Sequence, residues 1–114
     1  MTIQLFVSDK AVLSSLEFSL AAEGLPASDG EGSAPQGAVA AVVIDRGDLG
    51  ASLAFLTELR SEGCTAPAIV LATHPNARQR ANVAAAGAAL IEKPLLGDQL
   101  TFALRSALRF EKAA

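Results

Sequence analysis

The sequence predicts a doubly wound α/β domain built on one five-stranded parallel sheet. Apolar segments of strand length alternate with segments in which leucine or alanine recurs at helical spacing, and this order is typical of a parallel sheet with helices on both faces. Several apolar segments are hydrophobic throughout, as expected of strands buried on both faces. The 114 residues are enough for one domain with a real core. We therefore treat residues 1–114 as a single domain.

The first part of the chain predicts two strands around one helix. Residues 3–7 ("IQLFV") are rich in strand formers, and the leucines of residues 11–24 recur at helical spacing before a terminal glycine. Residues 25–38 contain three glycines and two prolines, which favours a short edge strand at most and no regular helix across 30–38. Residues 39–45 ("VAAVVID") are a continuous apolar run ending in a carboxylate, and they predict a strand buried on both faces.

The second part repeats the alternation of helix and strand. A final helix opens at "PLLGD", with Leu104 on its inner face. The elements before it are a helix over 49–63, a strand over 66–72, a helix over 77–87 capped by Asn76, and a strand over 88–93.

Composition excludes several function classes. The net charge of −3 gives no basic field for nucleic acid. The single cysteine, Cys64, allows no internal disulfide and fits a reducing compartment. Pairing Cys64 with His74 as a nucleophile is disfavoured, because no third group is evident to orient them. No segment has the length of a membrane span or the pattern of a signal peptide, so we expect a cytoplasmic location and no membrane partner.

Three ionisable residues follow strands that should end at one edge of the sheet. Asp9 comes after the first strand, Asp45 ends "VAAVVID", and Lys93 ends the apolar run in "LIEKPL". Parallel sheets place their sites at the carboxyl ends of the strands. A half-buried lysine needs an anionic partner, and two neighbouring carboxylates suit a divalent cation such as magnesium. A cation and an ammonium around one aspartate are suited to phosphoryl transfer onto that aspartate.

Simpler interpretations stand beside this one. Asp45 could be a solvated carboxylate or a helix cap, Asp9 an N-cap for the helix near residue 11, and Lys93 a structural ion-pair partner of Asp45. Arg78 and Arg80 fit the solvated face of their helix.

With Asp9, Asp45, the stretch "AAAGAALIEKP" and the helix lengths between them, the chain resembles the receiver domains of two-component response regulators and hybrid histidine kinases over nearly its whole length. The resemblance implies a flavodoxin-like receiver fold with Asp45 as phosphoacceptor. It also implies magnesium held by Asp9, Asp45 and the backbone of Gly47, with Lys93 contacting the phosphoryl group. The family has a cis peptide before the proline after this lysine, here Pro94.

The sequence departs from the family at positions that serve metal binding and switching. Ser8 replaces one of two adjacent acids, so magnesium binding should be weak. Ala72 stands where the family has a Thr or Ser, with Thr73 one place late, and Leu90 stands where an aromatic is common. The turn after Asp45 lacks the usual proline and is one residue short, and the family's second helix is shortened or missing. These departures predict a degenerate receiver whose phosphorylation is poorly coupled to conformation.

The favoured function is a two-component signalling receiver acting largely as a protein-interaction module, with a histidine kinase or a histidine phosphotransfer protein as partner. Any enzymatic activity is limited to self-catalysed phosphorylation and dephosphorylation of the aspartate. The alternative is a pseudo-receiver without phosphorylation that docks on a histidine kinase, docks within a larger kinase chain, or forms a homodimer. A small-ligand sensor is a weaker alternative, because Ser8-Asp9-Lys10 contains no glycine for a phosphate-binding loop.

Overall fold

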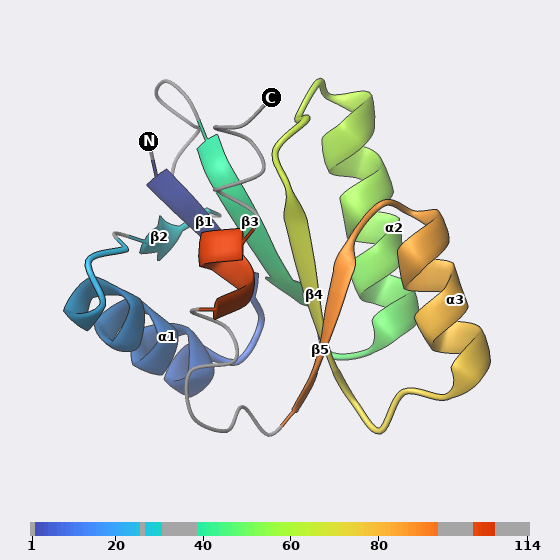
Figure 1. Ribbon diagram of the computed structural model, residues 1–114, viewed down its shortest axis with the longest axis horizontal. Coiled ribbons are helices and arrows are strands. Elements are labelled where there is room, and N and C mark those ends of the chain that lie inside the picture. Colours follow the sequence, from blue (N-terminus) through green and yellow to red (C-terminus); the bar gives the residue numbers. More distant parts are fainter. Residues whose placement is uncertain (1, 26, 31–38, 94–101, 107–114) are drawn as a thin grey trace.

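The computed structural model describes residues 2–25, 27–30, 39–93 and 102–106. In this part of the chain, five strands form one parallel sheet in the order β2-β1-β3-β4-β5, which confirms the predicted α/β architecture (Figure 1). The three-residue β2 is the short edge strand that the sequence allowed. The strands are β1 (Thr2–Val7), β2 (Ala27–Asp29), β3 (Val39–Asp45), β4 (Ala68–Thr73) and β5 (Ala89–Lys93).

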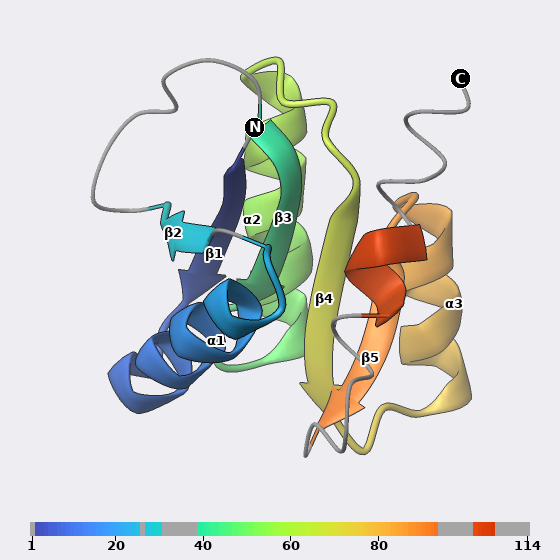
Figure 2. The same ribbon diagram turned by 60° about the vertical axis from the view of Figure 1, so that its left-hand side comes forward.

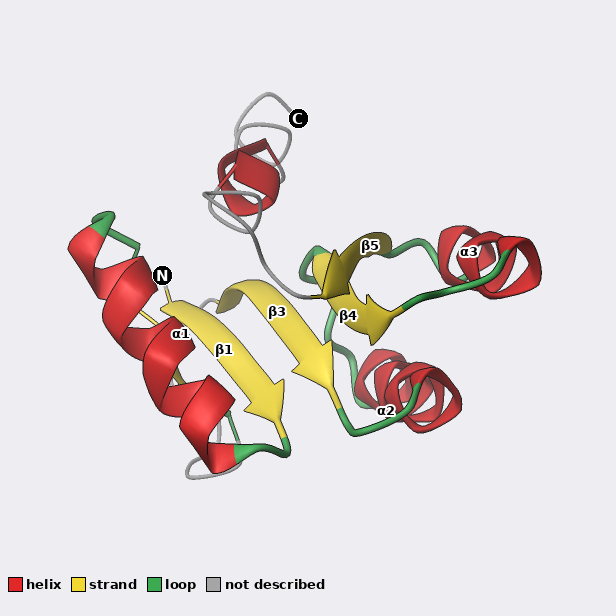
Figure 3. Ribbon diagram, turned by 90° about the horizontal axis from the view of Figure 1, so that it is seen from below, coloured by secondary structure: helices red, strands yellow, loops and turns green. Residues whose placement is uncertain are grey.

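Helices cover both faces of this sheet. Helix α1 (Lys10–Ala22) and the helical residues 102–106 lie on one face, while α2 (Leu49–Ser61) and α3 (Ala77–Ala85) lie on the other (Figure 3). All the strand pairings are parallel, so the strands end at one edge of the sheet, and Figure 2 shows the arrowheads of β4 and β5 side by side there. No helix among the described residues is long and apolar enough to cross a membrane.

Strand alternation divides the core into two layers. On β3 and β4, Val43, Ile69 and Leu71 pack with α1 and with Leu104, which is fully buried as predicted. The even-numbered residues of the same strands face α2 and α3: Val42, Ile44, Ala68, Val70 and Ala72. The uninterrupted apolar run of β3 therefore reflects burial on both faces, which its burial pattern confirms.

The predicted helix boundaries hold to within a few residues. Asn76 is the N-cap of α3, as predicted, and it forms a capping box with Gln79. Gly24 and Gly63 follow α1 and α2 with positive φ values of 78° and 97°, a conformation in which glycine has no steric penalty.

Strand β4 differs most from its expected bounds, while β1 and β5 differ by one residue at their starts. We predicted a strand over 66–72, whereas β4 begins at Ala68 and includes Thr73. Pairing with β5 explains the extension, because the parallel register continues to Thr73 opposite Lys93. Three other expectations lie wholly or largely outside the described residues: the absence of a regular helix over 30–38, the cis peptide at Pro94, and the final helix.

An aromatic stack lies on the α2 side of the sheet. The rings of Phe6 and Phe55 have centroids 4.8 Å apart at a tilt of 51°, and the Arg46 guanidinium lies 4.8 Å from the Phe55 centroid. Gly30 approaches Phe6 so closely that a Cβ built there would lie 2.5 Å from the ring. The turn after β2 therefore requires a residue without a side chain at this position.

Candidate functional site

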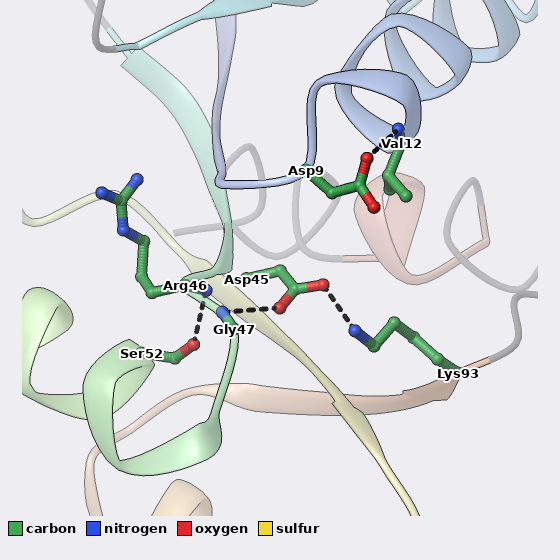
Figure 4. A network of polar contacts seen from close by, with 7 residues as sticks. All are labelled: Asp9, Val12, Asp45, Arg46, Gly47, Ser52 and Lys93. Atoms are coloured by element: carbon green, nitrogen blue, oxygen red, sulfur yellow. Dashed lines mark hydrogen bonds and ion pairs between the residues drawn. The ribbon is translucent and has the colours of Figure 1, made fainter.

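Asp45 lies at the carboxyl end of β3 and is 7% exposed. Its Oδ2 accepts a hydrogen bond from Lys93 Nζ at 2.7 Å, and its Oδ1 accepts one from the backbone N–H of Gly47 at 3.3 Å (Figure 4). Each carboxylate oxygen therefore has a donor. These two hydrogen bonds offset the cost of burying the carboxylate.

Lys93 reaches this carboxylate from the last residue of β5. Its side chain runs toward Asp45 in Figure 4, and the distance of 2.7 Å is that of a short charge-assisted hydrogen bond. The two residues are 48 positions apart in the sequence, so the fold itself creates the contact. This geometry agrees with the ion-pair interpretation of Lys93.

The turn after Asp45 is held by two local features. Gly47 has a φ of 102°, in the left-handed region that favours glycine, and its N–H faces the Asp45 carboxylate. The N–H of Arg46 donates to Ser52 Oγ at 3.0 Å, and Ser52 is fully buried in α2. The Arg46 side chain points away from Asp45 (Figure 4). Sequence reasoning missed Ser52, whose only signal is a serine on the otherwise leucine-lined inner face of a helix.

Asp9 lies beside Asp45 because β1 and β3 are neighbours. Val7 is opposite Asp45 in the register, and the N–H of Ser8 donates to the Asp45 carbonyl at 2.9 Å. Asp9 is exposed, and its Oδ1 accepts from the N–H groups of Ala11 at 2.9 Å and Val12 at 3.3 Å as the N-cap of α1. The N-cap interpretation of Asp9 is thus confirmed, and within the described part of the chain both of these hydrogen bonds use Oδ1 rather than Oδ2.

These residues offer a divalent cation only a sparse set of ligands. No group of three or more His, Cys, Asp and Glu side chains in the described part of the chain could hold a metal ion. Asp9 and Asp45 supply two carboxylates, and Asp45 is already neutralised by Lys93. Magnesium is commonly bound by one or two carboxylates with several waters, so the pair fits a weakly held ion.

Ala72, Thr73 and Leu90 are the positions on β4 and β5 at which the sequence departs from the receiver family. Ala72 is buried and carries no hydroxyl, while Thr73 is exposed and lies opposite Lys93 on the neighbouring strand. Leu90 is partly buried and packs against a cluster that includes Val83 of α3. In the sequence, the hydroxyl of Thr73 comes one position after Ala72, where the receiver family has a Thr or Ser. In the structure, Thr73 lies opposite Lys93 on β5.

A hollow of about 200 Å³ opens at this edge of the sheet. It is bounded by Gly47 and Lys93, the two residues that contact the carboxylate oxygens. The rest of its lining is Asp48, Leu49, Leu71, Ala72, Thr73 and Gln79. The hollow therefore has both polar and apolar side chains in its lining, and it includes the two residues that bind Asp45.

The remaining candidates fall outside this site. Cys64 precedes β4 and His74 follows it, so they lie at opposite ends of the strand and form no catalytic pair. His74 is an exposed loop residue as predicted, with Nδ1 3.9 Å from Glu92 Oε2. Arg80 donates to Glu92 at 2.9 Å on the exposed side of α3 and β5.

Comparison with solved structures identifies the fold. The Francisella response regulator 1452 receiver domain superposes with a TM-score of 0.80 at 14% identity, covering 96% of this chain and 98% of that one. A CheY-like receiver domain protein from Methanospirillum hungatei JF-1 gives 0.79 at 18%, covering 99% and 98%. NtrX from Brucella abortus, solved with ADP, gives 0.79 at 21%; the match covers 98% of this chain but only 27% of NtrX.

The chain therefore has the fold of response-regulator receiver domains, as the resemblance implied. Neither protein-family models nor curated proteins match its sequence. The likeness is thus one of structure, at sequence identities that establish the fold alone.

Proposed function

We propose that this domain is a two-component signalling receiver in which Asp45 accepts a phosphoryl group. The observation that carries the proposal is the Asp45–Lys93 contact of 2.7 Å at the carboxyl edge of a receiver fold. The donor would be a phosphohistidine of a histidine kinase or phosphotransfer protein. An Asp45 oxygen attacks phosphorus as the P–N bond breaks, leaving imidazole and an aspartyl phosphate, which water later hydrolyses to aspartate and inorganic phosphate.

Each residue of the site has a role in this proposal. Lys93 neutralises oxygens of the transferred group as Asp45 loses its own charge, and the Gly47 N–H orients the carboxylate for attack. Asp9 and Asp45, with the Gly47 backbone, would hold magnesium. When bound, the ion supplies charge neutralisation for the phosphoryl oxygens. The domain would then act mainly as an interaction module in the cytoplasm.

A pseudo-receiver is the second candidate function, and specific observations favour it. Ala72, one residue before the end of β4, offers no hydroxyl, and one Asp9 oxygen is committed to capping α1. In this alternative, Lys93 permanently satisfies Asp45, and the domain docks on a kinase or on a second copy without phosphorylation. The two candidates share a fold and differ in whether Asp45 undergoes chemistry.

Intact-mass spectrometry separates the two candidates. The chain is incubated with acetyl phosphate with and without magnesium, alongside Asp45→Asn. If the domain is a phosphoaccepting receiver, the wild type gains the mass of one phosphoryl group, and magnesium increases the fraction of chain that carries it. The Asp45→Asn variant gains none. Unchanged wild-type mass with both acetyl phosphate and a cognate phosphohistidine donor would favour the pseudo-receiver.

A further inference from the structure

Among the polar side chains that line the hollow, the proposed chemistry uses only Lys93 and gives no role to Asp48, Thr73 or Gln79. Gln79 is the third residue of α3, is half-buried, and lines the hollow together with Thr73 and Lys93. The sequence alone did not indicate that Gln79 lines a hollow, because neighbouring residues of α3 are polar. A carboxamide that lines the same hollow as the Lys93 ammonium has the chemistry to bind a phosphoryl oxygen there.

The capping box fixes which end of this carboxamide is free to donate. Gln79 Oε1 accepts from the backbone N–H of Asn76 at 2.8 Å, and the Gln79 N–H donates to Asn76 Oδ1 at 2.8 Å. Only the oxygen of a carboxamide can accept from an N–H, so the Nε2 amino group is the remaining end. No hydrogen bond between residues that the structure describes uses this Nε2.

The charges around the hollow make neutral donors valuable. Lys93 brings one positive charge, which it shares with Asp45. Asp48 brings a carboxylate whose Oδ1 accepts from Ala51 N–H at 2.7 Å. That carboxylate repels an incoming oxyanion, and Ala72 supplies no hydroxyl to offset it. Hydrogen bonds from uncharged groups would stabilise phosphoryl oxygens here without adding a further cation.

We propose that Gln79 is a binding residue for the phosphoryl group on Asp45, with the Thr73 hydroxyl as a second neutral donor. The inference rests on the proposed function. The Nε2 of Gln79 donates to a phosphoryl oxygen in the hollow, beside the oxygens that Lys93 contacts. Because the capping box holds Gln79 in place beforehand, this donor does not need to move when the phosphoryl group arrives. Such a preformed contact stabilises the adduct without requiring a change of conformation.

A single substitution separates this role from helix capping. Gln79→Glu keeps a side-chain oxygen for the Asn76 N–H, because glutamate and glutamine serve equally at this position of a capping box. It replaces the donating amino group with a negative oxygen next to the phosphoryl group. Ala81→Glu is the matched control: it adds the same charge at an exposed position about 200° further around α3.

The experiment measures the steady-state fraction of phosphorylated chain and its decay after acetyl phosphate is removed, by intact mass, with far-UV circular dichroism melts of each variant. We expect Gln79→Glu to lower occupancy or lifetime about tenfold, equivalent to 1.4 kcal/mol, while Ala81→Glu matches the wild type and all melts agree. If the wild type is phosphorylated and Gln79→Glu has the same occupancy and lifetime, the role of Gln79 is overturned while the proposed function stands. An unlabelled wild type that also fails to bind beryllofluoride would overturn both proposals.

Discussion

Replacing Lys93 by methionine should destabilise the fold more than replacing its partner Asp45 by asparagine. The Asp45 side chain is 9% exposed and the Lys93 side chain 29%. Lys93→Met therefore leaves a nearly buried carboxylate, with the Gly47 N–H at 3.3 Å as its other hydrogen bond among the described residues. Asp45→Asn instead removes the buried charge, keeps an oxygen for Gly47, and leaves the more exposed ammonium able to reach water.

The expected magnitude follows from this asymmetric burial. Removing one partner of a fully buried pair costs about 3–5 kcal/mol, whereas exposed pairs contribute about 0–1 kcal/mol. We expect a loss of about 2 kcal/mol for Lys93→Met and less than about 1 kcal/mol for Asp45→Asn. The double variant should recover part of the loss, because the carboxylate that Lys93→Met strands is then absent.

Urea unfolding followed by far-UV circular dichroism measures these free energies, since the chain has no Trp or Tyr for fluorescence. Lys10→Met, at an exposed position on α1, controls for the loss of a lysine. If Lys93→Met unfolds at the same urea concentration as Lys10→Met, the contact contributes nothing to stability. A double variant as unstable as the sum of its parts would show that the two residues are not coupled.

Three further predictions concern packing, metal binding and coupling. Gly30→Ala should cost about 1–3 kcal/mol in urea unfolding, because its Cβ would meet the Phe6 ring at 2.5 Å; unchanged stability would contradict that contact. Magnesium should shift the amide NMR signals of Asp9 and Asp45 together with a dissociation constant of about millimolar or weaker, since only two carboxylates are available; micromolar binding would contradict this ligand set. Beryllofluoride should change amide shifts across residues 73–95 and partner affinity only slightly, because Ala72 lacks the hydroxyl that would favour one conformer; widespread shifts or an affinity change of about tenfold would restore a conformational switch.

The sequence predicted the sheet well because its strands are chemically distinctive. The run "VAAVVID" is typical of a strand buried on both faces, as in a parallel sheet, and β3 has that burial. The rule that such strands share a carboxyl edge then placed Asp45 near Lys93, and the structure brings them to 2.7 Å. Local chemistry also located Asn76 as a cap, since a short polar side chain before a helix satisfies its first N–H groups.

Features that depend on three-dimensional context were not predicted. Ser52 appears in the sequence as an ordinary polar helix residue, yet it is fully buried because its Oγ accepts from Arg46 N–H. Gln79 appears as a solvent-facing residue, and its place in the hollow depends on where α3 packs. Strand β4 ends at Thr73, one residue later than predicted, because pairing with β5 rather than hydrophobicity determines where the strand stops.

Locating the phosphoryl group is the most direct test of the central proposal that Asp45 accepts it. The chain is treated with acetyl phosphate and magnesium, the acyl phosphate is trapped by borohydride reduction to homoserine, and peptides are sequenced by mass spectrometry. We predict homoserine at position 45 only, with none in chain that was not exposed to the phosphodonor. Homoserine at Asp9 or Asp48 instead, or an acid-labile phosphoryl group on His74, would contradict the assignment of Asp45.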